Sequence, residues 1–317
     1  MSEFPDKAVI AGVDGMASSL TAVRWAAVEA HRRRVELWLV HAFDKDSLEY
    51  PQPLPTRDEL ADMARMRGQR LLRQAREVAR EAEPSVEVQL ILRYEKPAQA
   101  LLAMSEDAGL LVLGPEEIRP LGRMLVGSVS IGLAAHAKCP VAVVRPRVAE
   151  EQPPSEGAVV VGIDGSRTSE AALALAFEEA SWRRAPLVAV HTWDHAFLSA
   201  LFEEARWTLD AREIEERESE VLAERLAGWQ EKYPDVAVER VVVRGRPADE
   251  LLRHADRAQL LVVGSRGRGG VAGMLLGSTS RHLLSYALCP VIVARSPEEE
   301  SRERDRPASA SIVHKGG

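Results

Sequence analysis

Long apolar segments are absent from this chain of 317 residues. No apolar run approaches the ~20 residues that a membrane-spanning helix requires, so we expect no contact with a membrane. Residues 1–7 also lack the basic and then apolar pattern of a secretory leader. Both observations predict a cytoplasmic protein.

A surplus of basic residues is missing as well. The chain has 41 Lys and Arg residues against 48 Asp and Glu residues, a formal net charge of −7, and its basic residues alternate with acidic ones. Such a pattern offers no electrostatic footprint for the phosphate backbone of DNA or RNA. We therefore expect no nucleic acid partner.

Cysteine is scarce: only Cys139 and Cys289 occur, each in a Cys-Pro pair at the start of an apolar run. If these runs pair as antiparallel strands, their starts lie about 15–20 Å apart at ~3.3 Å per residue, too far for a disulfide. We interpret both as small buried hydrophobic side chains.

His41 and His191 have no partner at metal-ligand spacing. The sequence therefore indicates hydrogen-bonded structural histidines, no metal site and no catalytic residue.

An internal repeat dominates what the sequence does contain. The segment VIAGVDG at Val9 returns at Val159 as VVVGIDG, and Cys139-Pro-Val returns as Cys289-Pro-Val. The offset is 150 residues here and in four further matched segments, with no net insertion between them. Chance does not hold one offset through six segments, so the chain is a duplicated domain.

Each copy alternates apolar strand candidates with segments of helical periodicity. This alternation predicts an α/β fold with a doubly wound, parallel, five-stranded sheet in each copy. The expected strands lie near residues 8–13, 36–42, 86–93, 109–113 and 141–145, and near residues 158–163, 187–192, 236–244, 259–263 and 291–294. Each copy ends on a short apolar strand, and the two exposed edges can pair about a pseudo-two-fold axis.

Composition sets the expected boundaries. We place the first domain at residues 1–146, a linker with proline and glutamate at 147–156, the second domain at 157–297, and a mixed-charge tail at 298–317, which we expect to be disordered.

A glycine-rich, basic loop follows the fourth strand of the second copy. Gly264, Gly267 and Gly277-Ser278 are spaced as Gly, two residues, Gly, nine residues, Gly-Ser. Glycines let successive backbone N–H groups face one point, and a helix that begins near Gly277 adds unpaired N–H groups. The pattern is typical of a phosphate cradle, and a tight turn without a ligand is the alternative.

These motifs together resemble the universal stress protein family, in its tandem form. The resemblance covers about residues 6–146 and 157–296 and rests on Asp-Gly after the first strand, Val-His on the second, the glycine loop with Gly-Ser, and Cys-Pro-Val at the last strand. It implies a sheet order of 3-2-1-4-5 in each copy, as in adenine nucleotide alpha hydrolase-like folds. It also implies that the last strands pair to give an intrachain pseudo-dimer. Further association of two chains into a homodimer stays open.

The resemblance also implies an ATP site in the second copy, in the crevice where the strand order reverses, with Mg²⁺ as a candidate companion ion. Carried over residue by residue, the site comprises Asp164, Thr192, Gly264, Arg266, Gly267, Gly277, Ser278 and Thr279. From the residues alone, the alternative is that Asp164 caps the helix that follows, and the two roles can coexist. Arg266 can equally be a solvated loop arginine.

The first copy departs from this pattern. Its matching positions are Asp14, Ala42, Gly114, Gly127, Ser128 and Val129. Its loop carries Pro115 and Glu116, and Glu117 replaces the second glycine. A backbone donor is lost and a carboxylate faces the expected phosphate. We therefore expect ATP in the second copy and weak or no binding in the first.

The function expected from these features is a nucleotide-binding regulatory protein that acts on an unknown protein partner in a stress response. One alternative is a slow ATPase or a phosphoryl- or adenylyl-transfer enzyme on the same fold. The motifs S-G-G-x-D-S, H-x-G-H and G-x-x-x-x-G-K-[ST] are absent, and no general base is evident, which disfavours that enzyme. The other alternative is a ligand-free interaction protein.

Overall fold

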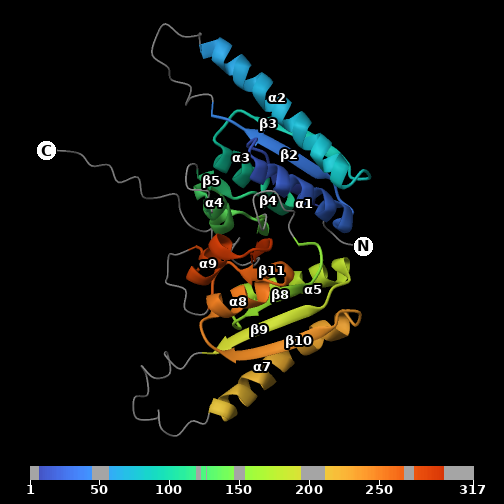
Figure 1. The fold of residues 1–317 in the computed structure, drawn as a ribbon, viewed down its shortest axis with the longest axis vertical. Coiled ribbons are helices and arrows are strands. Elements are labelled where there is room, and N and C mark those ends of the chain that lie inside the picture. Colours follow the sequence, from blue (N-terminus) through green and yellow to red (C-terminus); the bar gives the residue numbers. More distant parts are fainter. Residues whose placement is uncertain are drawn as a thin grey trace, which may run out of the picture.

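The computed structural model describes residues 7–44, 57–118, 123–125, 127–145, 154–193, 211–267 and 275–295. The chain forms two α/β halves that follow one another along the longest axis of the molecule (Figure 1). Most of the expected linker and the whole of the expected tail lie outside the described residues.

The N-terminal half follows the alternation predicted from the sequence. Its sheet strands are β1 (Ala8–Gly12), β2 (Leu37–Ala42), β3 (Val88–Arg93), β4 (Ala108–Leu113) and β7 (Val141–Val143). Its helices are α1 (Ala17–Arg33), α2 (Arg57–Ala82), α3 (Pro97–Met104) and α4 (Ser128–His136). Two short strands that the sequence did not predict, β5 (Glu116–Ile118) and β6 (Arg123–Leu125), pair as an antiparallel ribbon between β4 and α4.

The C-terminal half repeats the arrangement without such a ribbon among its described residues. Its strands are β8 (Ala158–Ile163), β9 (Leu187–Trp193), β10 (Val238–Arg244), β11 (Ala258–Gly264) and β12 (Val291–Ala294). Its helices are α5 (Arg167–Arg183), α7 (Ala211–Lys232), α8 (Pro247–Ala255) and α9 (Ser278–Tyr286).

One sheet of ten strands runs through both halves, in the order β10-β9-β8-β11-β12-β7-β4-β1-β2-β3. Neighbouring strands are parallel within each half, whereas β7 and β12 pair antiparallel, with Ala142 opposite Ile292. Each half therefore has the order 3-2-1-4-5, and the two last strands join the halves. The predicted fold is confirmed.

The central strands are buried on both faces, which explains their continuous apolar sequences. On the face covered by α1 and α5, a single apolar cluster continues from one half into the other and includes Val112, Phe177 and Val262.

Cys139 and Cys289 are separate, buried thiols. Burial raises the pKa of Cys139 to about 12, so its thiolate does not form at physiological pH.

Four ionisable side chains connect α1 with α5 across the pseudo-two-fold axis, and we call Glu29, Arg33, Glu179 and Arg183 the interface quartet. Both glutamates are fully buried. Arg33 donates from Nε to Glu29 at 2.8 Å and from Nη2 to Glu179. Arg183 donates from Nη2 to Glu29 at 2.6 Å and from Nε to Glu179 at 3.1 Å. Each carboxylate therefore faces both guanidinium groups.

The carboxyls of the interface quartet titrate as a pair because they are in contact. Burial and the adjacent Glu29 carboxylate raise the pKa of Glu179 to about 7. Burial also acts to raise the pKa of Glu29, but the charges of Arg183 and Arg33 outweigh it and lower that pKa to about 2. The pair therefore takes up its first proton near neutral pH.

This titration predicts a pH-dependent stability. A carboxyl whose pKa rises on folding binds its proton more tightly in the folded state, so its stabilising effect is full below its ordinary pKa of 4.5 and is lost as the pH rises to about 7. The Glu179→Gln variant keeps a neutral side chain at every pH. In urea unfolding from pH 4.5 to 7.5, we expect the wild-type midpoint to fall relative to that of the variant. Parallel midpoints over this range would contradict the assignment.

Candidate functional site

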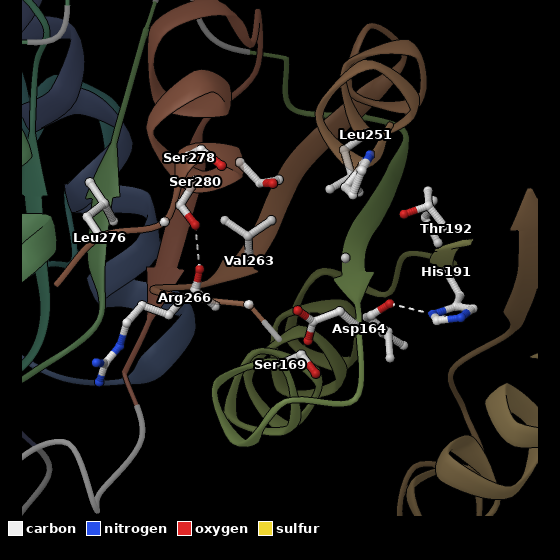
Figure 2. Close-up of a pocket in the computed structure, with 18 residues that line it drawn as sticks. Asp164, Ser169, His191, Thr192, Leu251, Val263, Arg266, Leu276, Ser278 and Ser280 are labelled. Carbon is white, nitrogen blue, oxygen red and sulfur yellow. Dashed lines mark hydrogen bonds between the residues drawn. The ribbon is translucent and has the colours of Figure 1, made fainter. Parts of the chain in front are cut away.

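A cavity of about 550 Å³ opens at the carboxyl ends of β8, β9 and β11, beside the start of α9 (Figure 2). It lies where the strand order reverses, between β8 and β11, which is where open α/β sheets bind their ligands. All eight residues proposed from the sequence line this cavity: Asp164, Thr192, Gly264, Arg266, Gly267, Gly277, Ser278 and Thr279. That they hold a nucleotide stays a prediction.

Asp164 follows β8 directly, and its carboxylate is hydrogen-bonded on one side and closely approached by the glycine loop on the other. Its Oδ1 accepts a hydrogen bond from the Ser166 backbone N–H at 2.9 Å. Its Oδ2 faces Gly267, where an added Cβ would come within 2.5 Å. The N-cap of α5 is Ser166, whose Oγ accepts from the Ser169 backbone N–H, so the capping role considered for Asp164 is wrong. Gly267 is the residue that lets the loop approach this carboxylate.

The glycine loop is held by its carbonyl groups. Thr168 in α5 donates its hydroxyl to the Arg266 carbonyl, and Ser280 in α9 donates to the Gly264 carbonyl at 2.7 Å. The Gly277 backbone N–H donates to the Ser265 carbonyl at 2.8 Å. Three consecutive carbonyls are thus engaged by the neighbouring helices. Thr168 and Ser280 were not among the predicted site residues, because their only signal is a hydroxyl in the first turn of each helix.

The start of α9 borders the cavity. Gly277 is its N-cap residue with extended backbone, and no side chain caps the helix. The first turn contains Ser278 and Thr279 and no acidic residue. The unpaired N–H groups at a helix start and the positive end of its dipole favour an anion, so this edge of the cavity is suited to phosphate.

His191 and Thr192 come from the end of β9. His191 is buried, its Nδ1 lies 2.7 Å from the Ile163 carbonyl and its Nε2 lies 2.9 Å from Glu218 of α7. His191 is therefore hydrogen-bonded as predicted, and it also lines the cavity; that its role is structural stays a prediction. The Arg266 side chain points away from Asp164 in Figure 2.

The matching region of the N-terminal half is built differently. Asp14 repeats the turn of Asp164, because its Oδ1 accepts from the Met16 backbone N–H at 2.8 Å. The loop, however, leaves β4 as the β5–β6 ribbon. The Glu116 carboxylate lies against Gly127, the N-cap residue of α4, where an added Cβ would collide with it. The obstruction proposed from Glu117 concerns a side chain outside the described residues; Glu116 brings an acidic group to the helix start.

A family model described as "Universal stress protein family" matches the chain twice, over residues 7–145 and 157–295. Universal stress protein Rv2005c of Mycobacterium tuberculosis is 42% identical over 290 residues, which is 90% of this chain and 96% of that protein. Universal stress protein Rv2623 of the same species is 41% identical over 294 residues, with the same two coverages. A solved structure of a universal stress protein from Archaeoglobus fulgidus has a TM-score of 0.64 at 20% identity, covering 92% of this chain and 99% of that one.

Proposed function

The chain belongs to the universal stress protein family, with two family modules in tandem, and we propose that it is a regulatory protein that binds ATP in its C-terminal module. The observation that carries this proposal is the edge of the cavity at the start of α9. There, an uncapped helix start without acidic residues meets a glycine loop whose carbonyls are engaged elsewhere. Such an arrangement selects anions through main-chain N–H groups.

The remaining lining suits the rest of a nucleotide. Val190, Leu251 and Val263 give the cavity an apolar wall, and Asp164 supplies a carboxylate that can accept from a ribose hydroxyl or a base amine. The volume of about 550 Å³ lies within the ordinary range for small-molecule sites. We propose that the nucleoside lies against this wall and the phosphates lie at the start of α9.

Mg²⁺ fits this lining as a companion of ATP. The described residues contain no group of three or more His, Cys, Asp or Glu side chains that could hold a metal alone. Protein-bound Mg²⁺ commonly uses one or two carboxylates together with phosphate oxygens and water, and Asp164 is the carboxylate that lines the cavity. When bound, the ion would neutralise phosphate charge.

We propose a binding role in preference to catalysis. The described residues that line the cavity include no lysine, and Asp164 already accepts the Ser166 N–H through Oδ1. Efficient phosphoryl transfer needs charge neutralisation and an oriented nucleophile. We therefore expect ATP turnover far below the ~1–10³ s⁻¹ of ordinary enzymes.

The wider role is proposed from family membership. We propose that nucleotide occupancy alters the two-module chain, and through it a protein partner, during a stress response in the cytoplasm. Among the described helices, none combines the length and the hydropathy needed to cross a bilayer.

Equilibrium titration with a fluorescent ATP analogue, checked by native mass spectrometry, tests the proposal. We expect one ATP per chain, competition by ATP and ADP, and much weaker competition by cyclic AMP, which lacks the polyphosphate tail. Two equivalent sites per chain would contradict the asymmetry of the modules. No binding in the presence of Mg²⁺ would contradict the proposed function.

Thr168→Val tests how the glycine loop is held. Valine keeps the shape of threonine but cannot donate to the Arg266 carbonyl. Losing one hydrogen bond to a part-buried carbonyl costs about 1–1.5 kcal/mol, so we expect ATP affinity to fall about fivefold to tenfold. Ser18→Ala, at the matching position of α1, is the control and should leave the affinity unchanged. Equal affinities for both variants would show that the loop does not depend on this hydroxyl.

A further inference from the structure

One arginine reaches from each module to a helix of the other. Arg145 follows β7 of the N-terminal module, and its Nη2 donates to the Leu284 carbonyl of α9 at 3.2 Å. Arg295 follows β12 of the C-terminal module, and its Nη1 donates to the Ala135 carbonyl of α4 at 2.6 Å. The two arginine contacts are reciprocal because β7 and β12 pair antiparallel, so each strand ends beside the opposite module.

Both carbonyls belong to the last turn of their helix, where no intrahelical partner exists. In α9 the Leu283 carbonyl accepts from the Ala287 backbone N–H at 2.9 Å, and the next carbonyl, of Leu284, accepts from Arg145. The last turn of α9 contains no basic residue of its own, whereas that of α4 contains His136. Arg145 therefore supplies the cation at the end of α9.

A cation at the C-terminus stabilises a helix through its dipole and fixes the position of its end. Helix α9 has nine residues and spans roughly 13 Å at ~1.5 Å per residue. Its other end is the phosphate-facing edge of the cavity, where Gly277, Ser278 and Thr279 lie. A rigid element this short transmits a shift at one end to the other.

We propose that Arg145 is a positioning residue for the nucleotide site of the opposite module. The inference rests on the proposed function and goes further, because it makes the affinity of the C-terminal site depend on its contact with the N-terminal module. The N-terminal module then contributes to binding through the far end of α9, although its own loop has diverged. By thermodynamic reciprocity, ATP bound to the C-terminal module strengthens the contact between the modules.

The test compares Arg145→Met with Arg295→Met in the full chain. Each variant removes one guanidinium, with its hydrogen bond to a helix carbonyl of the opposite module, from the same interface, so their general effects on packing are matched. We expect Arg145→Met to weaken ATP binding about threefold to thirtyfold and Arg295→Met to change it less than twofold. Arg145→Lys retains the charge and should recover part of the loss, which also separates positioning from misfolding.

Hydrogen exchange without nucleotide gives a second readout. Arg145→Met should raise amide exchange in residues 278–286, and Arg295→Met should raise it in residues 128–136. Equal losses of ATP affinity in both variants, or unchanged affinity and exchange in Arg145→Met, would overturn the inference. Failure of the wild-type chain to bind ATP would instead overturn the proposed function, and the exchange data would still show whether Arg145 fixes α9.

Discussion

Gly267→Glu is expected to weaken ATP binding by about a thousandfold. Even a Cβ at this position would come within 2.5 Å of Asp164 Oδ2, so the loop must move away from the carboxylate. The new carboxylate would also face the phosphates. At ~4 Å and an effective dielectric constant near 20, that repulsion costs up to ~4 kcal/mol, which corresponds to the expected loss of affinity. Titration with a fluorescent ATP analogue measures it.

Two further variants separate the causes of this loss. Gly267→Ala adds the steric conflict without the charge, so its loss should be smaller. Gly228→Glu adds the same charge in α7 at an exposed position, where an added Cβ meets nothing within 4 Å, and should leave ATP affinity unchanged. Wild-type affinity in a folded Gly267→Glu protein would place the nucleotide elsewhere in the chain.

Arg183→Met is expected to lower the free energy of unfolding by about 3–5 kcal/mol. Arg183 donates to both glutamates of the interface quartet, and its guanidinium lies 5.6 Å from the centre of the Trp25 ring. In the Arg183→Met variant both fully buried carboxyls remain. Within the interface quartet, Arg33 is then the guanidinium that contacts them. A buried charge that loses its partner is far more costly than an exposed one.

Urea unfolding followed by tryptophan fluorescence measures this effect. Arg65→Met is the matched control, because Arg65 pairs with Asp62 at 3.2 Å while their side chains are 46% and 67% exposed. Exposed pairs contribute about 0–1 kcal/mol, so the control should be close to wild type. If both variants lost the same stability, the interface quartet would contribute no more than a surface ion pair.

The fold was predictable because the repeat and the alternation of elements carry most of the information. The constant offset between segments such as those at Val9 and Val159 required two like halves, and the short strands at Val141 and Val291 indicated the edge at which they pair. The cavity residues could be grouped because the ends of parallel strands meet at one edge of a sheet. Asp164 and the glycine loop thus come together from positions about 100 residues apart.

Interactions across the pseudo-two-fold axis could not be predicted in this way. Glu29 with Arg33, four residues apart in α1, has the spacing of an ordinary surface pair, and only the approach of α5 turns it into a buried contact with Arg183. Arg145 offered no sequence signal either, because its partner is a backbone carbonyl 139 residues away. The β5–β6 ribbon was missed because each of its strands has only three residues.

The antiparallel pairing of β7 with β12 joins two modules that are formed by separate segments of one chain. In an assembly of two identical subunits, every substitution would alter both sites at once. Here the N-terminal module has Glu116 and Glu117 at the positions where the C-terminal module keeps Arg266 and Gly267. Because both modules belong to one chain, each can change in sequence independently of the other. One module can then specialise in holding a ligand while the other specialises in supporting it.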